Sequence, residues 1–338
     1  MHVFEVANVG VALPTVLRAL SQQTQQRDSR NGPVFAFPGP VTTVYSHPTQ
    51  RVLFWPQREA NPFFHLMESL WMLAGRRDVE YLTRFVKGMG AYSDDGRHFH
   101  AAYGYRWRKH FKKDQLTVIV ERLRANPEDR RSVLQIWDAS VDLGTESKDL
   151  PCNMIVSFQR NASGALDMTV FNRSNDIVWG AYGANAVHFS ILQEYIASSI
   201  GCAVGTYWQV SANFHAYLST YEKVREIAES NEPDPYLRGE VEPYPIMCTT
   251  QRVWDQDLAM FLAEPGTVGL REPFFRRVAV PMYMAHAAYK REKGTEGCDA
   301  ALEIIQQCHA TDWRRAGTEW LERRRAERVI KKGTQADA

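Results

Sequence analysis

Residues 154–174, MIVSFQRNASGALDMTVFNRS, carry the clearest β-strand signal in the chain. Two runs rich in β-branched and aromatic residues flank a turn at Ser163-Gly164, which is typical of a β-hairpin. Helical periodicity follows over residues 187–200, and another strand is expected at 206–211. Because strands and helices mix without regular alternation, the pattern predicts an α+β domain and not a doubly wound sheet.

On the N-terminal side of this hairpin the sequence alternates apolar segments with polar loops. From the spacing of apolar residues, helices are expected at 11–20, 61–74 and 78–86, and strands at 41–45 and 52–55. The chain is also helical and basic from about residue 300. Neither a GxGxxG nor a GxxxxGK[ST] motif occurs, so neither a dinucleotide fold nor a P-loop is indicated.

Composition narrows the class of protein. Hydrophobic residues make up 44% of the 338 residues and charged residues 23%, as in a globular protein with a real core. The net charge of +1 gives no electrostatic sign of nucleic-acid or membrane binding, so a small nucleotide in a local pocket is the better expectation. The N-terminus lacks a signal-peptide pattern and no apolar run reaches the length of a membrane span, so we expect a cytoplasmic protein.

The five cysteines are scattered, without a CxxC pair or a His/Cys metal spacing. They are expected to be reduced thiols, and no metal site is expected. Cys152, within LPCN, would by itself be interpreted as a buried structural thiol. The string FNRSNDIVWGAYGANAVHFS at 171–190 changes this interpretation, because it gathers more polar groups than a core can easily satisfy. An arginine, a hydroxyl and an amide are the groups that a nucleotide pocket needs.

Five motifs, in order, resemble those of the thymidylate synthase family, which includes the pyrimidine nucleotide hydroxymethylases. They are MESLWMLAG with Glu68 and Trp71, YGYRWR from Tyr103 to Arg108, Arg130-Arg131 before a strand, Pro151-Cys152, and Arg173-Ser174-Asn175-Asp176 followed by Gly180. The resemblance covers residues 30–217. It implies a large mixed β-sheet covered by helices, with one sheet face packed in a homodimer. It also implies a catalytic domain at 1–300, followed by a C-terminal helical extension at 301–338 with a frayed tail.

The resemblance assigns roles around the nucleophile. C6 of a pyrimidine is a weak electrophile, and C5 becomes nucleophilic only after a thiolate adds at C6, which Cys152 would do. Adjacent arginines would lower the pKa of Cys152. Arg173 and Arg30 would hold the phosphate with Ser174, although Arg30 could equally be a solvated surface charge. Arg130 and Arg131 would reach the phosphate bound by the neighbouring subunit.

Further residues would serve the base and the co-substrate. Glu68 lies on an otherwise apolar helix face, where a carboxylate without a task is costly, and would relay protons near O4 of the base. Tyr103 would organise water around C5. Asp176 would contact the pterin of 5,10-methylenetetrahydrofolate. Trp71 and Tyr92 are expected to line the folate site.

The chain departs from the family pattern at the base and sugar positions. The base-reading asparagine is expected at the position of Ala184, and a one-residue insertion in GAYGAN restores the register at Asn185. Asn185 favours uracil, because family members that read cytosine tend to carry aspartate there. The histidine-x-tyrosine pair that binds the sugar is matched to Gln209 and Ser211, which leaves deoxyribose and ribose both open.

Two absences bear on the product. The chain ends RVIKKGTQADA, without the family's closing proline-valine-alanine segment, and FVKGMGAYSDDG lacks the tryptophans that shield the folate. Poorer exclusion of water favours its addition to the C5-methylene intermediate over hydride transfer. We therefore expect a dUMP hydroxymethylase. An ordinary thymidylate synthase, a dCMP or CMP hydroxymethylase, and a catalytically silent structural or RNA-binding member remain as alternatives.

Overall fold

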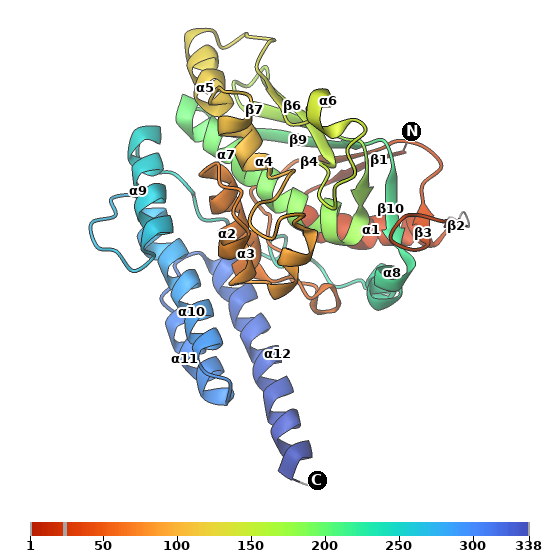
Figure 1. Ribbon diagram of the computed structural model, residues 1–338, viewed down its shortest axis with the longest axis vertical. Coiled ribbons are helices and arrows are strands. Elements are labelled where there is room, and N and C mark those ends of the chain that lie inside the picture. The colour runs from red at the N-terminus through yellow and green to blue at the C-terminus, as the bar shows by residue number, and fades with distance from the viewer. Residues whose placement is uncertain (1, 23–25, 337–338) are drawn as a thin grey trace.

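Two β-sheets form the centre of the computed structural model, which describes residues 2–22 and 26–336 (Figure 1). The larger sheet has six strands, in the order β1 (His2–Val6), β4 (Val41–Tyr45), β9 (Val204–Ser211), β7 (Leu166–Asn172), β6 (Asn153–Arg160) and β5 (Val133–Gln135). The smaller has four, in the order β2 (Gln26–Arg27), β3 (Val34–Ala36), β10 (Phe214–Tyr217) and β8 (Asn175–Asp176). Both sheets mix parallel and antiparallel pairs, as the α+β expectation requires.

Some of the α-helices cover one face of the larger sheet, and the last three extend away from it (Figure 1). In chain order the α-helices are α1 (Val9–Ser21), α2 (Pro62–Leu73), α3 (Val79–Thr83), α4 (Tyr103–Tyr105), α5 (Gln115–Ala125), α6 (Ala139–Asp142), α7 (Ala186–Ile200), α8 (Leu218–Val224), α9 (Gln251–Ala263), α10 (Val280–Arg291), α11 (Thr295–Ile305) and α12 (Thr311–Ala336). α7 packs against β7 and β9, and α2 packs on α7. The side chain of Asn61 caps the start of α2, and α7 ends at Gly201 with φ +73°.

The opposite face of the larger sheet carries apolar side chains that remain accessible. Side chains alternate between the two faces of a strand, so Val156 and Val170 are buried under the helices while their neighbours Ile155 and Phe171 face outward. Ile155 pairs with Phe171, and Phe171 with Val210, which forms a continuous apolar row across three strands. Such a row is typical of a surface that another protein covers.

The three last helices extend away from the sheets, and the C-terminus lies at the far end of α12 (Figure 1). α12 returns to the core through Trp320, whose ring meets Phe63 of α2 edge to face at 5.5 Å. Among the described residues, no helix is long and apolar enough to cross a membrane. The division expected at residue 300 falls within α11 and stays a proposal, and the last two residues of the tail lie outside the described residues.

The strand expected at 52–55 is wrong. These residues are extended but pair with no described strand, and the backbone N–H of Val52 donates to the hydroxyl of Tyr236 instead. Val52 and Leu53 are buried, so this apolar run packs in the core but does not pair with another strand. The hairpin at 154–174, the strands at 41–45 and 206–211, and the helices at 11–20, 61–74, 78–86 and 187–200 are confirmed within a few residues.

Asp312 at the start of α12 makes stability depend on pH. The side chain is buried, accepts hydrogen bonds from the Tyr236 hydroxyl (2.8 Å) and the Trp313 N–H (2.7 Å), and burial raises its pKa to about 6. Because the folded-state pKa exceeds the unfolded value, the folded state gains stability as pH falls from 8 towards 4. Asp312→Asn should remove about 3 kcal/mol of that pH dependence.

Urea unfolding at pH 5 and pH 8 checks this expectation, with the exposed Asp28→Asn as the control. Asp312→Asn should be more stable than the wild type by about 3 kcal/mol at pH 8, and the difference should narrow to about 1.5 kcal/mol at pH 5. An unchanged difference between the two pH values would contradict the assignment.

Candidate active site

Two adjoining cavities meet at Cys152. The first, of about 370 Å³, lies between α2, α7 and the segment that follows β7, a size typical of small-molecule sites. The second opens beside it towards the loop that carries Arg30. The residues that line both are Tyr92, Tyr103, Asp149, Cys152 and Ser174. Cys152 therefore stands where the two compartments join, as a nucleophile between two substrates would.

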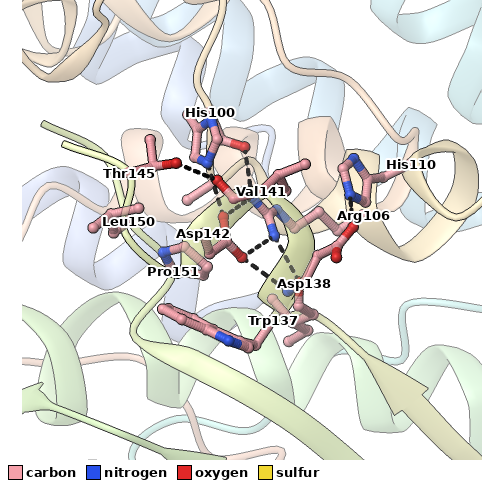
Figure 2. Close-up of polar contacts among 12 residues, drawn as sticks. His100, Arg106, His110, Trp137, Asp138, Val141, Asp142, Thr145, Leu150 and Pro151 are labelled. Atoms are coloured by element: carbon pink, nitrogen blue, oxygen red, sulfur yellow. Dashed lines mark hydrogen bonds and ion pairs between the residues drawn. The ribbon is translucent and has the colours of Figure 1, made fainter. Parts of the chain in front are cut away.

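A buried ionic network holds the loop that leads to Cys152 (Figure 2). Arg106 donates two hydrogen bonds to Asp142, at 2.6 and 2.7 Å, and one to the carbonyl of Ile136. His100 contacts the same carboxylate at 2.8 Å, and the N–H of Asp138 donates to it. The network thus ties the YGYRWR segment to residues 136–142, ahead of Pro151-Cys152.

The expected lowering of the Cys152 pKa is wrong. Burial raises the pKa of the thiol above its ordinary value, and this outweighs the opposite effect of Arg173 and Arg30. Asp149 and Asp176 add to the rise. The thiol is therefore protonated in the unliganded protein at neutral pH and needs a proton acceptor before it can attack.

The second cavity brings together the expected phosphate ligands. Arg30, Arg173 and Ser174 all line it with Cys152. Arg173 donates from Nε to the carbonyl of Pro151 (2.9 Å) and from Nη2 to that of Leu150 (3.3 Å), which places the guanidinium behind the nucleophile. Nη1 of Arg30 lies 3.5 Å from the carbonyl oxygen of Ser147.

Arg130 and Arg131 lie elsewhere. Both are exposed just before β5, at the edge of the larger sheet, and neither is among the residues that line the two cavities. The Arg131 side chain is 81% exposed and contacts Asp129 at 3.4 Å. Within one subunit the structure does not bring this pair to Cys152.

The structure places Gln209 and Ser211 in β9, away from the lining residues. Both are 1% exposed: Gln209 donates to the Tyr207 hydroxyl at 3.0 Å, and Ser211 accepts from Asn175 at 3.1 Å. His215 and Tyr217 of β10 line the second cavity instead, with Arg173. The structure thus brings His215 and Tyr217 to the cavity with Arg173, and does not bring Gln209 and Ser211 there. The signal was present, since His215-Ala-Tyr217 is itself a histidine-x-tyrosine sequence.

Glu68 of α2 and His188 of α7 form a pair on the wall of the first cavity. Nε2 of His188 lies 3.2 Å from Oε2 of Glu68, and their side chains are 4% and 14% exposed. The ring of His65 stands 6.3 Å from that of His188, and burial, with Arg58 nearby, holds the pKa of His65 well below its ordinary value. His65 is therefore neutral, while Nε2 of His188 contacts Glu68 without the geometry of a hydrogen bond. Sequence reasoning did not single out His188.

The segment that leads to Asn185 is an irregular helix. Residues Ile177–Asn185 form a π-helix with non-helical angles at Tyr182 and Gly183, leading directly into α7. A π-helix is how a helix accommodates one extra residue. Asn185 lines the first cavity and is buried, with its amide hydrogen-bonded to Asn153 and Asn175.

Asp176, Trp71 and Tyr92 also line the first cavity. Oδ1 of Asp176 accepts from the Trp179 N–H at 2.5 Å, Oδ2 is buried with no partner among the described atoms, and burial raises the pKa of the carboxyl. Tyr92 is 56% exposed at the opening, whereas Trp71 is buried. Trp179, which sequence reasoning missed, is 48% exposed there and stacks on Arg58 at 4.2 Å.

The chain belongs to the thymidylate synthase family, whose model matches residues 21–250, and this membership makes it a folate-dependent pyrimidine C5 one-carbon transferase. The deoxyuridylate hydroxymethyltransferase of Pseudomonas phage M6 is 56% identical over 100% of this chain and 98% of that protein. The enzyme of the same name from Bacillus phage SP01 is 40% identical over 54% of this chain and 50% of that protein. The crystal structure of thymidylate synthase from T4 phage aligns with TM-score 0.53 and 19% identity, over 65% of this chain and 81% of that one, which is a likeness of fold.

Proposed function

We propose that this protein transfers the one-carbon unit of 5,10-methylenetetrahydrofolate to C5 of dUMP and releases 5-hydroxymethyl-dUMP. The observation that supports this proposal most strongly is the 56% identity to the phage M6 enzyme over the whole chain. The cavity supports it, because it presents a thiol, a carboxylate and an amide together in Cys152, Glu68 and Asn185. These are the groups that C6 addition, proton transfer and base recognition require.

The reaction begins when the Cys152 sulfur adds to C6 and gives up its proton. Asp149, which lines both cavities beside Cys152 and whose pKa burial raises, is a suitable acceptor. The electrons of the C5–C6 double bond move onto C5 and O4, and C5 attacks the methylene carbon of the folate. Tyr103, whose hydroxyl accepts the Cys152 N–H at 3.4 Å, would hold water beside the same ring.

The product is decided at the next intermediate. The water held by Tyr103 takes the C5 proton, and N5 of the folate takes up a proton as the C–N bond breaks and tetrahydrofolate leaves. An exocyclic methylene conjugated to C4=O remains. Water adds to that carbon, its proton passes to Glu68, and the electrons return through C5 to expel the Cys152 thiolate from C6. Glu68, whose carboxylate lies on the cavity wall 3.2 Å from Nε2 of His188, is the carboxylate available for this step.

The nucleotide would lie across the two cavities. Its phosphate would meet Arg30, Arg173 and Ser174 in the second, and its base would meet Asn185 in the first. The folate would occupy the rest of the first cavity, against Trp71, Tyr92 and Trp179, with its pterin at the unpartnered Oδ2 of Asp176. No group of three or more metal-binding side chains occurs among the described residues, and no step needs a metal.

We also propose a homodimer formed through the outer face of the larger sheet. The apolar row of Ile155, Phe171 and Val210 would be buried there, which accounts for its exposure in a single chain. Arg130 and Arg131, exposed at the edge of the same sheet, would then reach the phosphate bound by the partner. A role in the partner's site would explain why Arg130 and Arg131 line neither cavity of their own subunit.

We propose that His215 and Tyr217, which line the second cavity, bind the sugar. Tyr217→Phe removes one hydroxyl that would hydrogen-bond the sugar, so KM for dUMP should rise about 3- to 10-fold with kcat nearly unchanged. Steady-state kinetics with dUMP measure this. Gln209→Leu is the matched comparison, since it should lower the melting temperature and leave KM within about 2-fold. A raised KM in Gln209→Leu with an unchanged KM in Tyr217→Phe would instead support a sugar site at β9.

Product analysis tests the proposed function. The protein is incubated with dUMP and methylenetetrahydrofolate, the nucleotide product is identified by mass, and dihydrofolate is followed by its absorbance. We expect 5-hydroxymethyl-dUMP without dihydrofolate. Thymidylate with stoichiometric dihydrofolate would instead make the protein a thymidylate synthase, and preferential conversion of dCMP or CMP would make it a cytidylate hydroxymethylase.

A further inference from the structure

A chain of buried side-chain amides crosses the floor of the first cavity. Nδ2 of Asn153 donates to Oδ1 of Asn185 at 3.1 Å, and Nδ2 of Asn185 donates to Oδ1 of Asn175 at 3.0 Å. Nδ2 of Asn175 then donates to Oγ of Ser211 at 3.1 Å. All four residues are at most 7% exposed. Three amides and a hydroxyl therefore form one directional series of hydrogen bonds.

The members of the chain come from four separate elements. Asn153 begins β6 directly after the nucleophile, Asn175 lies in β8, Ser211 ends β9, and Asn185 ends the π-helix. Only tertiary packing brings them together, and Asn175 and Asn185 also line the first cavity. The position of the Asn185 side chain is thus set from both sides by residues of the sheets.

The series couples the orientation of the Asn185 amide to the orientations of Asn153 and Asn175. If that amide alone turned over, its N–H groups would face the N–H groups of Asn153, and its oxygen would face the oxygen of Asn175. Two buried hydrogen bonds would be lost and four polar groups left without partners, which is costly in a buried site. The three amides can turn over only together, and that would place Nδ2 of Asn153 where its Oδ1 now lies buried without a partner.

Polarity matters because uracil and cytosine present opposite edges. Uracil has a donor at N3 and an acceptor at O4, whereas cytosine has an acceptor at N3 and a donor at N4. The Asn185 amide uses one N–H to bond Asn175 and one lone pair to accept from Asn153. Its second N–H and second lone pair remain for the base. Held in one orientation, this remaining pair matches one base and opposes the other.

We propose that Asn153 and Asn175 are positioning residues that set base specificity, by locking the Asn185 amide in the orientation that reads uracil. The inference rests on the proposed function and deepens it, because it names what prevents the reader from turning over to accept cytosine. Asn153 is the more important of the two, because its N–H is the donor that Oδ1 of Asn185 faces.

Two variants carry the same chemical change with opposite expected results. In Asn153→Asp the donor facing Oδ1 of Asn185 becomes an acceptor, so the Asn185 amide is driven to turn over. In Asn175→Asp the oxygen that accepts from Asn185 is kept, and Ser211 can reverse its own hydroxyl to donate. Base preference should therefore change in the first variant and be kept in the second.

The measurement is release of tritium from 5-tritiated dUMP and dCMP by the full-length protein with methylenetetrahydrofolate, taken as the ratio of the two kcat/KM values. Asn153→Asp should lower the dUMP:dCMP ratio by about 10- to 100-fold, and Asn175→Asp should leave it within about 3-fold. A merely structural role would lower both rates together. Equal ratios in the wild type and a folded Asn153→Asp variant, or the same shift in both variants, would overturn the proposal.

Asn153→Ala keeps the test decisive if the buried carboxylate prevents folding. It removes the donor without adding a charge and should lower the ratio by about 3- to 10-fold, whereas an unchanged ratio would overturn the proposal. A wild type that prefers dCMP would refute the proposed substrate separately. In that case, an equal shift of Asn153→Asp towards dUMP would still support the amide lock.

Discussion

Replacing Cys152 with alanine should abolish tritium release from 5-tritiated dUMP, with a loss of at least about 10⁴-fold. No other residue at the junction of the two cavities offers a thiol, and without addition at C6 the C5 carbon does not become nucleophilic. Because tritium release needs only C6 addition and activation of C5, it reports this step whatever the final product is.

Cys248→Ala is the matched control for this result. Cys248 is exposed and lies outside both cavities, so its variant should keep the wild-type rate. Burial raises the pKa of Cys152, so the wild-type rate should also increase as pH rises above neutrality, while more of the thiol ionises. Substantial tritium release by Cys152→Ala would contradict the role of this residue.

Replacing Glu68 with glutamine should lower kcat for product formation by about 10²- to 10⁴-fold, with a much smaller change in KM for dUMP. Glutamine keeps the size of the side chain but removes the base that receives a proton when water adds to the exocyclic methylene. Steady-state kinetics with quantification of 5-hydroxymethyl-dUMP measure the loss. A rise in KM at constant kcat would instead indicate a binding role.

The partner of Glu68 provides the control. If His188 acts by holding the carboxylate at 3.2 Å, His188→Ala should lower kcat less than Glu68→Gln does, and the double variant should be no worse than Glu68→Gln alone. Additive losses would show that His188 acts independently of Glu68.

Sequence reasoning reached the features that local patterns encode. The hairpin around residues 154–174 and the helix at 61–74 follow from the period of their apolar residues, and both are confirmed. The motifs around Cys152 and Arg173 led to two residues that the fold does bring to one cavity. In each case, the necessary information lies within about twenty consecutive residues.

What sequence reasoning missed depends on packing between distant segments. The pKa of Cys152 is raised because the finished fold buries the thiol, which outweighs the arginines that the motifs supply. His188 and Glu68 meet across two helices, and the amides of Asn153, Asn175 and Asn185 meet across two sheets and a π-helix. That Gln209 and Ser211 of β9 are buried away from both cavities, whereas His215 and Tyr217 line one, likewise depends on the packing of the finished fold.

The source of the oxygen atom in the product tests the central claim most directly. The protein, dUMP and methylenetetrahydrofolate are incubated in water enriched in ¹⁸O, and the nucleotide product is analysed by mass spectrometry. Addition of water to a Cys152-bound methylene intermediate predicts 5-hydroxymethyl-dUMP that carries one ¹⁸O in the new hydroxyl. A methylated product without the label, formed together with dihydrofolate, would contradict the account.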